Sequence, residues 1–185
     1  MRKLFCFVIA TIFLLICLPG KSYCYAAASQ LELEWDHLTP IGKDRDLDTE
    51  SLHILKKVSE TPNKSIYRGI TITRPRGDIL WEKQNRNSSA AGAGPVYLLR
   101  YERQAGKLST ALDISGGFIV YDKKFPAGGQ YYNFMWRLGP RFIYKINENS
   151  SVNIGYTFMH VSNGLRTHNP GYDAHGVSLG FSATF

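Results

Sequence analysis

The chain predicts an all-β protein, an eight-stranded antiparallel transmembrane β-barrel of the outer membrane. Two alternating segments carry much of this prediction. Apolar residues occupy the even positions from Phe134 to Ile146 and again from Val152 to Phe158, whereas the odd positions are mostly polar or glycine. A period of two is that of a strand with one apolar face. The last segment also alternates and ends on an aromatic residue, Phe185, which resembles the assembly signal of bacterial outer-membrane proteins.

Periodicity alone does not separate such a barrel from a soluble β-sandwich, but the connections do. They alternate in length, with Gln104–Gly106 and Asn147–Asn149 short and Asp122–Gln130 and Asn163–Asp173 long. Short turns at one end and long loops at the other are typical of outer-membrane barrels. Roughly eight strands of about ten residues are the smallest usual number, and side chains fill the lumen of so small a barrel.

The chain begins with the three parts of a secretory signal. Arg2 and Lys3 precede an uncharged apolar run from Leu4 to Leu18, and small residues up to Ala28 offer a cleavage site. A retained anchor helix is the alternative, but the run is short for a helical span. We therefore expect a signal peptide over residues 1–28 and a single barrel domain over 29–185.

Cleavage of this leader removes all three cysteines, Cys6, Cys17 and Cys24. A mature chain without a thiol excludes disulfide bonds and a cysteine nucleophile. The same cleavage leaves 19 basic against 15 acidic residues, a formal charge of +4. This modest excess argues against a nucleic-acid partner.

The first half of the barrel domain is less certain than the second. Residues 29–64 are polar, with a short alternating strand near Leu31 to Trp35 and a weak amphipathic pattern from Thr49 to Ser59. Ile66 to Arg74 reads as a strand ended by Pro75, because proline cannot donate to a ladder. Further candidate strands are Asp78–Gln84, Pro95–Arg103, Lys107–Tyr121, Tyr131–Ile146, Ser150–Ser162 and Ala174–Phe185, with a loop over Asn85–Gly94.

His160 and Ser162 lie two positions apart, so both project from the apolar face of their strand. A serine hydroxyl needs a base within hydrogen-bond reach, and that base needs a third group to orient it. Antiparallel pairing with the next strand would bring Asp173 beside His160. Asn169 is a candidate amide donor to an oxyanion, with a backbone N–H near Gly164 as its partner. The alternative is that these are ordinary polar residues where a strand leaves the bilayer.

The sequence from His160 to Gly164, followed by Asn169-Pro170-Gly171 and an acidic residue, resembles the lipid A 3-O-deacylase (PagL-type, acyloxyacyl hydrolase-like) family. The resemblance covers about Gly94 to Phe185. It implies an eight-stranded outer-membrane barrel that hydrolyses the acyl ester at the 3-position of lipid A without a cofactor. Its nucleophile, base and acid fall on Ser162, His160 and Asp173, and its oxyanion amide on Asn169. The family's acid is usually Glu, and an Ala is more usual at Gly164.

Arg166 follows Ser162 at the level where lipid A phosphates would sit, and a guanidinium binds phosphate with two parallel hydrogen bonds. It is therefore a candidate substrate contact. Two histidines of this region, His168 and His175, have no further ligands in their setting, so no metal is predicted.

The sequence thus predicts an outer-membrane serine esterase whose partners are lipopolysaccharide and outer-membrane lipids, with a homodimer left open. The alternatives are a non-enzymatic small barrel, structural or adhesive, and a secreted soluble β-domain.

Overall fold

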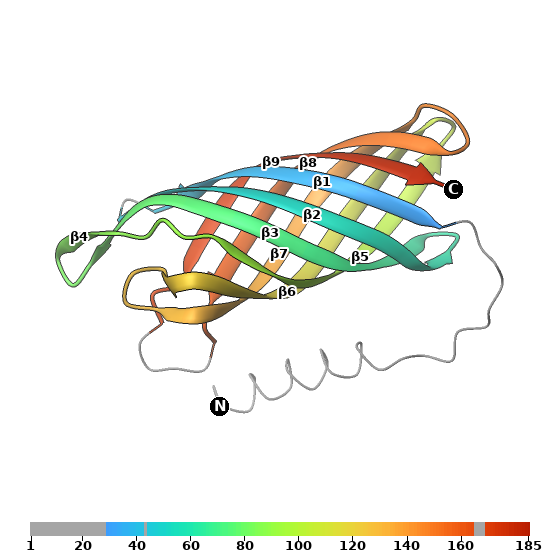
Figure 1. Ribbon diagram of the computed structural model, residues 1–185. Coiled ribbons are helices and arrows are strands. Elements are labelled where there is room, and N and C mark those ends of the chain that lie inside the picture. The colour runs from blue at the N-terminus through green and yellow to red at the C-terminus, as the bar shows by residue number, and fades with distance from the viewer. Residues whose placement is uncertain (1–28, 43, 165–168) are drawn as a thin grey trace, which may run out of the picture.

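The computed structural model describes residues 29–42, 44–164 and 169–185, so the predicted signal peptide lies outside the described residues. The described chain forms one antiparallel sheet that closes on itself (Figure 1). Its strands are β1 (Gln30–Ile41), β2 (Arg45–Thr61), β3 (Lys64–Trp81), β4 (Gln84–Asn87), β5 (Gly92–Ala105), β6 (Leu108–Phe125), β7 (Gln130–Lys145), β8 (Ser150–Ser162) and β9 (Tyr172–Thr184). No helix long and apolar enough to cross a membrane occurs in these ranges.

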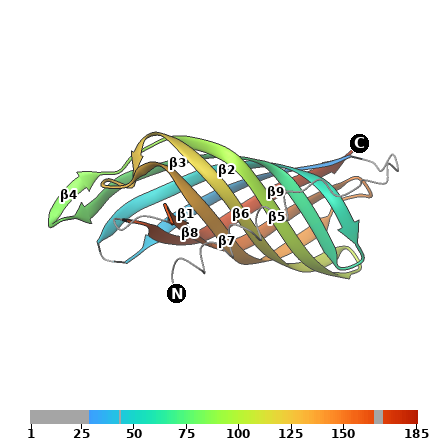
Figure 2. The same cartoon turned by 90° about the horizontal axis from the view of Figure 1, so that it is seen from below.

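Eight of these strands form the barrel, which confirms the predicted fold class. Each pairs with the next barrel strand along the chain, so that β3 pairs with β5, and β1 closes the ring by pairing with β9. The short β4 pairs only with the end of β3, and this hairpin extends beyond the barrel (Figure 2). Backbone hydrogen bonds between Ser29 and Phe185 join the two ends of the described chain. We call the opposite end, where β8 ends and β9 begins, the rim.

Several expected strand boundaries are wrong. Pro75 does not end a strand, since β3 continues through it to Trp81. It is tolerated because it lies where the second neighbour of β3 changes, between the pairings of Thr73 with β5 and of Asp78 with β4. The expected strand Asp78–Gln84 is divided by the turn at Glu82 and Lys83 between β3 and β4, and the expected loop Asn85–Gly94 contains most of β4 and the start of β5. The connection between β6 and β7 is also shorter than expected, because both strands extend farther.

The lumen away from the rim is filled by paired charges. Arg100 contacts the carboxylates of Glu32 and Asp113 at 2.8 to 2.9 Å, and all three residues are buried. Arg141 extends the network, with its guanidinium 2.7 Å from Asp113 and 2.7 Å from Glu34. Buried charges are stable only when they are paired and hydrogen-bonded. The pairing explains why β1 alternates acidic and apolar residues although it lies in the barrel.

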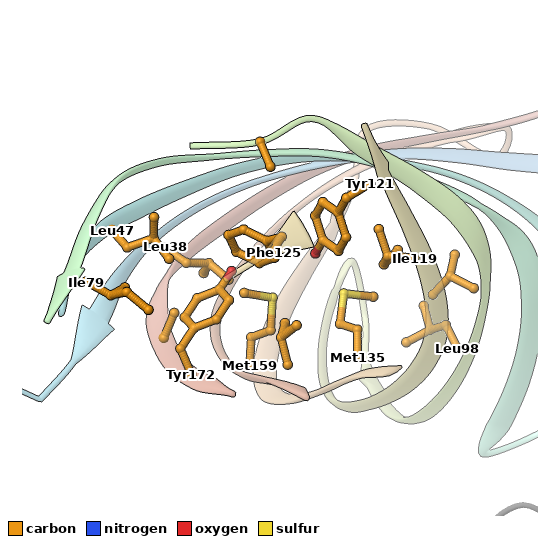
Figure 3. Close-up of a cluster of buried hydrophobic side chains, with 14 of the residues drawn as sticks. Leu38, Leu47, Ile79, Leu98, Ile119, Tyr121, Phe125, Met135, Met159 and Tyr172 are labelled. Carbon is orange, nitrogen blue, oxygen red and sulfur yellow. The ribbon is translucent and has the colours of Figure 1, made fainter. Parts of the chain in front are cut away.

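The rim end of the lumen is filled by apolar side chains instead. Figure 3 shows the aromatic rings of Tyr121, Phe125 and Tyr172 with the methionines Met135 and Met159 inside the barrel. The phenol of Tyr172 hydrogen-bonds Thr49 at 2.9 Å, so its polar atom is satisfied. These side chains pack against the inner face of β8 and β9 beneath the rim.

The outer face of the barrel carries the opposite pattern. Its large apolar side chains are exposed on every barrel strand and include Trp35, Ile72, Leu112 and Phe142. A protein in water does not leave so continuous an apolar surface exposed. The apolar face therefore lies against lipid, and His160 and Ser162 project from it near the rim.

Candidate active site

His160 and Asp173 face each other across the pairing of β8 with β9. They are direct register partners, and Nδ1 of His160 lies 2.7 Å from Oδ1 of Asp173. The side chains are 32% and 46% exposed, so the pair is accessible from outside the barrel. Register partners have Cβ atoms about 5 Å apart, which is close enough for the short aspartate to reach the ring.

This contact determines which ring nitrogen of His160 is left to act. An ionised carboxylate only accepts hydrogen bonds, so Nδ1 must carry the proton and donate to Asp173. In the neutral ring Nε2 is then an acceptor. The pair therefore presents a base whose orientation is held by an acid, as a hydroxyl nucleophile requires.

Ser162 is the last residue of β8, on the same outer face as His160. Within the described residues, its hydroxyl makes no hydrogen bond with the His160 ring. Such contacts are often long in free enzymes and shorten with substrate bound. Gly171 packs closely behind the serine, because a Cβ at this position would lie 3.0 Å from Cβ of Ser162 and 2.7 Å from the carbonyl oxygen of Val161. Glycine at 171 thus allows the returning chain to fix the position of Ser162.

An aromatic ring on β7 packs against His160. Trp136 is the register partner of His160 on that side, and the two rings are stacked with centroids 5.7 Å apart. The indole also contacts Phe158, two residues before His160 on the same face. The stacked indole limits the orientations that the imidazole ring can adopt. Sequence reasoning assigned Trp136 only to the apolar face, because its contact with His160 depends on the strand register.

The connection between β8 and β9 places Asn169 beside the end of β8. The backbone N–H of Asn163 donates to Oδ1 of Asn169 at 3.1 Å. The carbonyl side of the amide is thus held, and its NH₂ group is the donor side that remains for a ligand. Gly164 has a φ of +64°, a conformation that favours glycine, and an added Cβ would lie 3.3 Å from the Phe134 ring. The more usual alanine would be strained here.

A second arginine near the site was not identified from the sequence. Arg45, at the start of β2, is half-buried and donates from a guanidinium nitrogen to the carbonyl oxygen of Gly171 at 2.8 Å. This hydrogen bond joins the start of β2 to the residue that precedes β9. The two residues are 126 positions apart, so no local signal could have found the contact. The expected substrate contact Arg166 lies outside the described residues.

A buried group in the lumen has metal-ligand side chains but a different role. Glu34, Asp36 and His53 lie close together. Arg137 contacts all three: its guanidinium lies 2.6 Å from Nε2 of His53 and 3.3 Å from Oδ2 of Asp36, and it hydrogen-bonds Glu34. A fixed guanidinium repels a metal cation, so these acids are neutralised by arginine.

A second histidine–carboxylate pair on the outer face provides an internal comparison. Nδ1 of His37 on β1 lies 2.7 Å from Oε1 of Glu50 on β2, again across a register pair. The hydroxyl two positions on, Thr39, donates to the carbonyl oxygen of His175 at 3.3 Å. The pair therefore has the same histidine–carboxylate contact as His160 and Asp173, but the hydroxyl beside it already donates to a backbone carbonyl.

Comparison with protein families identifies the group to which these features belong. The family model of lipid A 3-O-deacylase (PagL) matches residues 57–182, more than half of the chain. The chain belongs to this family. Membership confirms the resemblance that the sequence around His160 indicated, and the match extends into strands β2 and β3, which that resemblance did not cover. No curated protein sequence matches this chain.

Solved structures of similar fold agree. The crystal structure of the outer membrane enzyme PagL matches with a TM-score of 0.58 at 15% identity, over 84% of this chain and 99% of that one. The crystal structure of Neisserial surface protein A (NspA) matches with a TM-score of 0.57 at 10% identity, over 87% and 98% of the two chains. Together with the family, these matches confirm an eight-stranded barrel of the outer membrane.

Proposed function

We propose that this chain is a serine esterase that removes the acyl chain ester-linked at the 3-position of lipid A. Membership of the lipid A 3-O-deacylase family supports the reaction and the substrate. The observation that carries the proposal is the 2.7 Å contact of His160 with Asp173 on the lipid-facing side of the barrel, with Ser162 on the same face.

In the first step, Oγ of Ser162 attacks the ester carbonyl carbon while Nε2 of His160 takes the hydroxyl proton. Asp173 accepts from Nδ1 throughout and stabilises the imidazolium that forms. The tetrahedral intermediate collapses, the bond to the sugar oxygen breaks, and His160 returns its proton to that oxygen. The sugar leaves with a free 3-hydroxyl and the acyl group remains on Ser162.

In the second step, water replaces the sugar. His160 takes a proton from water, the hydroxide attacks the acyl-enzyme carbonyl, and Ser162 leaves as its alkoxide and is reprotonated by His160. The fatty acid is released and the enzyme is restored without a cofactor. In both steps the NH₂ group of Asn169 is the proposed donor to the oxyanion. The backbone N–H at Gly164 stays a prediction as its partner.

The position of the site fits an amphiphilic substrate. Below the rim, the outer face presents Trp136, Phe158 and Leu138 to lipid. An acyl chain can lie along this wall while its ester reaches Ser162 at the edge of the apolar band. With the ends of the barrel domain on the periplasmic side, the rim faces the outer leaflet, where lipopolysaccharide is the ester-bearing lipid.

The test is the release of fatty acid from lipid A by purified, folded protein in detergent. Ser162→Ala should reduce the rate by at least about 10³-fold, since loss of a triad nucleophile removes nearly all chemical-step catalysis. The matched control is Ser150→Ala, which removes a hydroxyl from the same strand and face at the opposite end. Full activity in Ser162→Ala would exclude this nucleophile.

A second comparison tests the base. His160→Gln should abolish release, whereas His37→Gln should leave it within about twofold, because both variants break an equivalent histidine–carboxylate contact and only one is beside the serine. Equal losses in the two variants would mean that the effect is structural. Loss of activity in the His160 variant alone would refute a non-catalytic role for His160.

A further inference from the structure

A basic hollow lies on the outer wall of the barrel near the rim, away from the candidate active site. It has a volume of about 360 Å³ and lies between the ends of β3 and β6, where β5 begins. In the ring of strands, β5 is separated from β8 by β6 and β7. The hollow therefore faces a different part of the surrounding membrane from Ser162.

Cationic side chains dominate the lining of the hollow. Arg74, Arg76 and Lys123 are exposed there, against one carboxylate, Asp122. One oxygen of that carboxylate already accepts from the backbone N–H of Ala91 at 2.9 Å. Within the described chain, the side chains of the two arginines and the lysine form no hydrogen bond or salt bridge with other residues. The hollow thus offers three cations that their surroundings do not neutralise by direct contact.

The acids of the neighbouring strand are arranged beside the arginines and not inside the hollow. Asp48 and Glu50 on β2 are the register partners of Arg76 and Arg74. Glu50 is engaged by His37 at 2.7 Å. These acids reduce the net charge of the surface, but the guanidinium nitrogens of both arginines still lack a bonded acceptor.

Directly below the cations, the wall becomes apolar. Ile72, Ala93 and Val120 form one row across β3, β5 and β6. Ile72 and Val120 are 49% and 53% exposed. The middle residue has only a methyl group, so the row forms a low strip between two branched side chains. It lies two residues farther from the rim than Arg74 and Asp122.

We infer that this surface binds a phosphorylated glycolipid of the outer leaflet as a bound lipid separate from any substrate. The guanidinium groups of Arg74 and Arg76 each match a phosphate with two parallel hydrogen bonds. An acyl chain of the same molecule covers the strip over Ala93, where burial of apolar surface adds to the affinity. The cationic side chains near the rim and the apolar strip below them match a single lipid with a phosphorylated head group and acyl chains. The inference does not depend on hydrolysis at Ser162.

The experiment counts lipids bound to the full chain by native mass spectrometry in detergent. Ser162→Ala is the background, so that no lipid is consumed. Bisphosphorylated lipid A should bind at this surface, and Arg74→Gln with Arg76→Gln should raise the dissociation constant of one bound lipid by about tenfold or more. The control, Arg68→Gln with Arg103→Gln, removes two exposed arginines from β3 and β5 toward the opposite end of the strands.

Three further measurements test which ligand binds and whether it covers the strip over Ala93. Dephosphorylated lipid A should lose the same bound lipid, and Ala93→Phe should displace it because the ring fills the strip. Inorganic phosphate and phosphatidylglycerol vesicles should compete at least tenfold less well than bisphosphorylated lipid A. Unchanged lipid counts in the double variant, an equal loss in the control, or equal competition by phosphatidylglycerol would overturn the assignment.

Discussion

Replacing Gly171 with alanine tests whether the strand after the site fixes Ser162. The new Cβ would lie 2.7 Å from the carbonyl oxygen of Val161 and 3.0 Å from Cβ of Ser162, so both must move by a few tenths of an ångström or more. Overpacking of this kind costs about 1–3 kcal/mol of stability. Misplacement of a reacting group by about 1 Å costs about 100-fold in rate. We therefore expect kcat/KM to fall between about 10-fold and 100-fold.

The assay is fatty-acid release from lipid A, normalised to the folded fraction measured by heat-modifiable gel migration. Gly106→Ala is the control, because its φ of +65° strains any side chain while no atom lies within 4 Å of the added Cβ. It lies in the β5–β6 turn, at the end opposite the rim. A wild-type rate for the Gly171 variant, or an equal loss in the Gly106 variant, would refute the reasoning.

Four further variants address the acid, the rim and the assembly of the barrel. Asp173→Asn should lower the rate of fatty-acid release by at least about 100-fold because an amide cannot stabilise the His160 imidazolium, whereas Asp173→Glu should stay within about tenfold; similar rates for both would make Asp173 a surface charge. Arg45→Met should lower the rate several-fold by releasing the carbonyl oxygen of Gly171, which steady-state kinetics would detect; an unchanged rate would show that this contact is dispensable. Deletion of Phe185 should reduce the folded fraction in outer membranes while the inserted protein keeps its specific activity, and normal insertion would count against its role in assembly.

The second half of the barrel could be predicted because its outer face is mostly apolar. β8 was predicted with the bounds that the structure has, Ser150–Ser162. The first strands were harder to recognise because their inward residues are acids, as in Glu32 and Glu34, which read as a solvated surface. Their ion pairs with arginines of distant strands become visible only in the closed barrel.

Strand boundaries near prolines were mispredicted for a related reason. A proline breaks a strand only where the neighbouring strand requires a hydrogen bond from the missing N–H. Which positions require that bond depends on how the neighbouring strand is paired. Pro75 lies where β3 exchanges one neighbour for another, and the described pairing of β5 with β6 is interrupted at Pro95. Neither interruption can be read from the local sequence.

The candidate site could be predicted in part. Alternation placed His160 and Ser162 on one face, and antiparallel order brought Asp173 beside His160, where the structure finds it. Asp173 was expected at the end of the connection, whereas it belongs to β9. Trp136 and Arg45 could not be assigned, since their contacts depend on register and on closure of the ring. The three expected catalytic residues could therefore be predicted from local sequence patterns. The residues that pack around them could not, because they come from distant parts of the chain.

The most direct measurement is the mass spectrum of lipid A from Gram-negative cells that express the chain. Wild-type protein should shift lipid A by the loss of the single acyl chain ester-linked at the 3-position. Ser162→Ala, at the same level of folded protein in the outer membrane, should leave lipid A unmodified. Unmodified lipid A in cells with folded wild-type protein, or the same loss with Ser162→Ala, would contradict the proposed esterase.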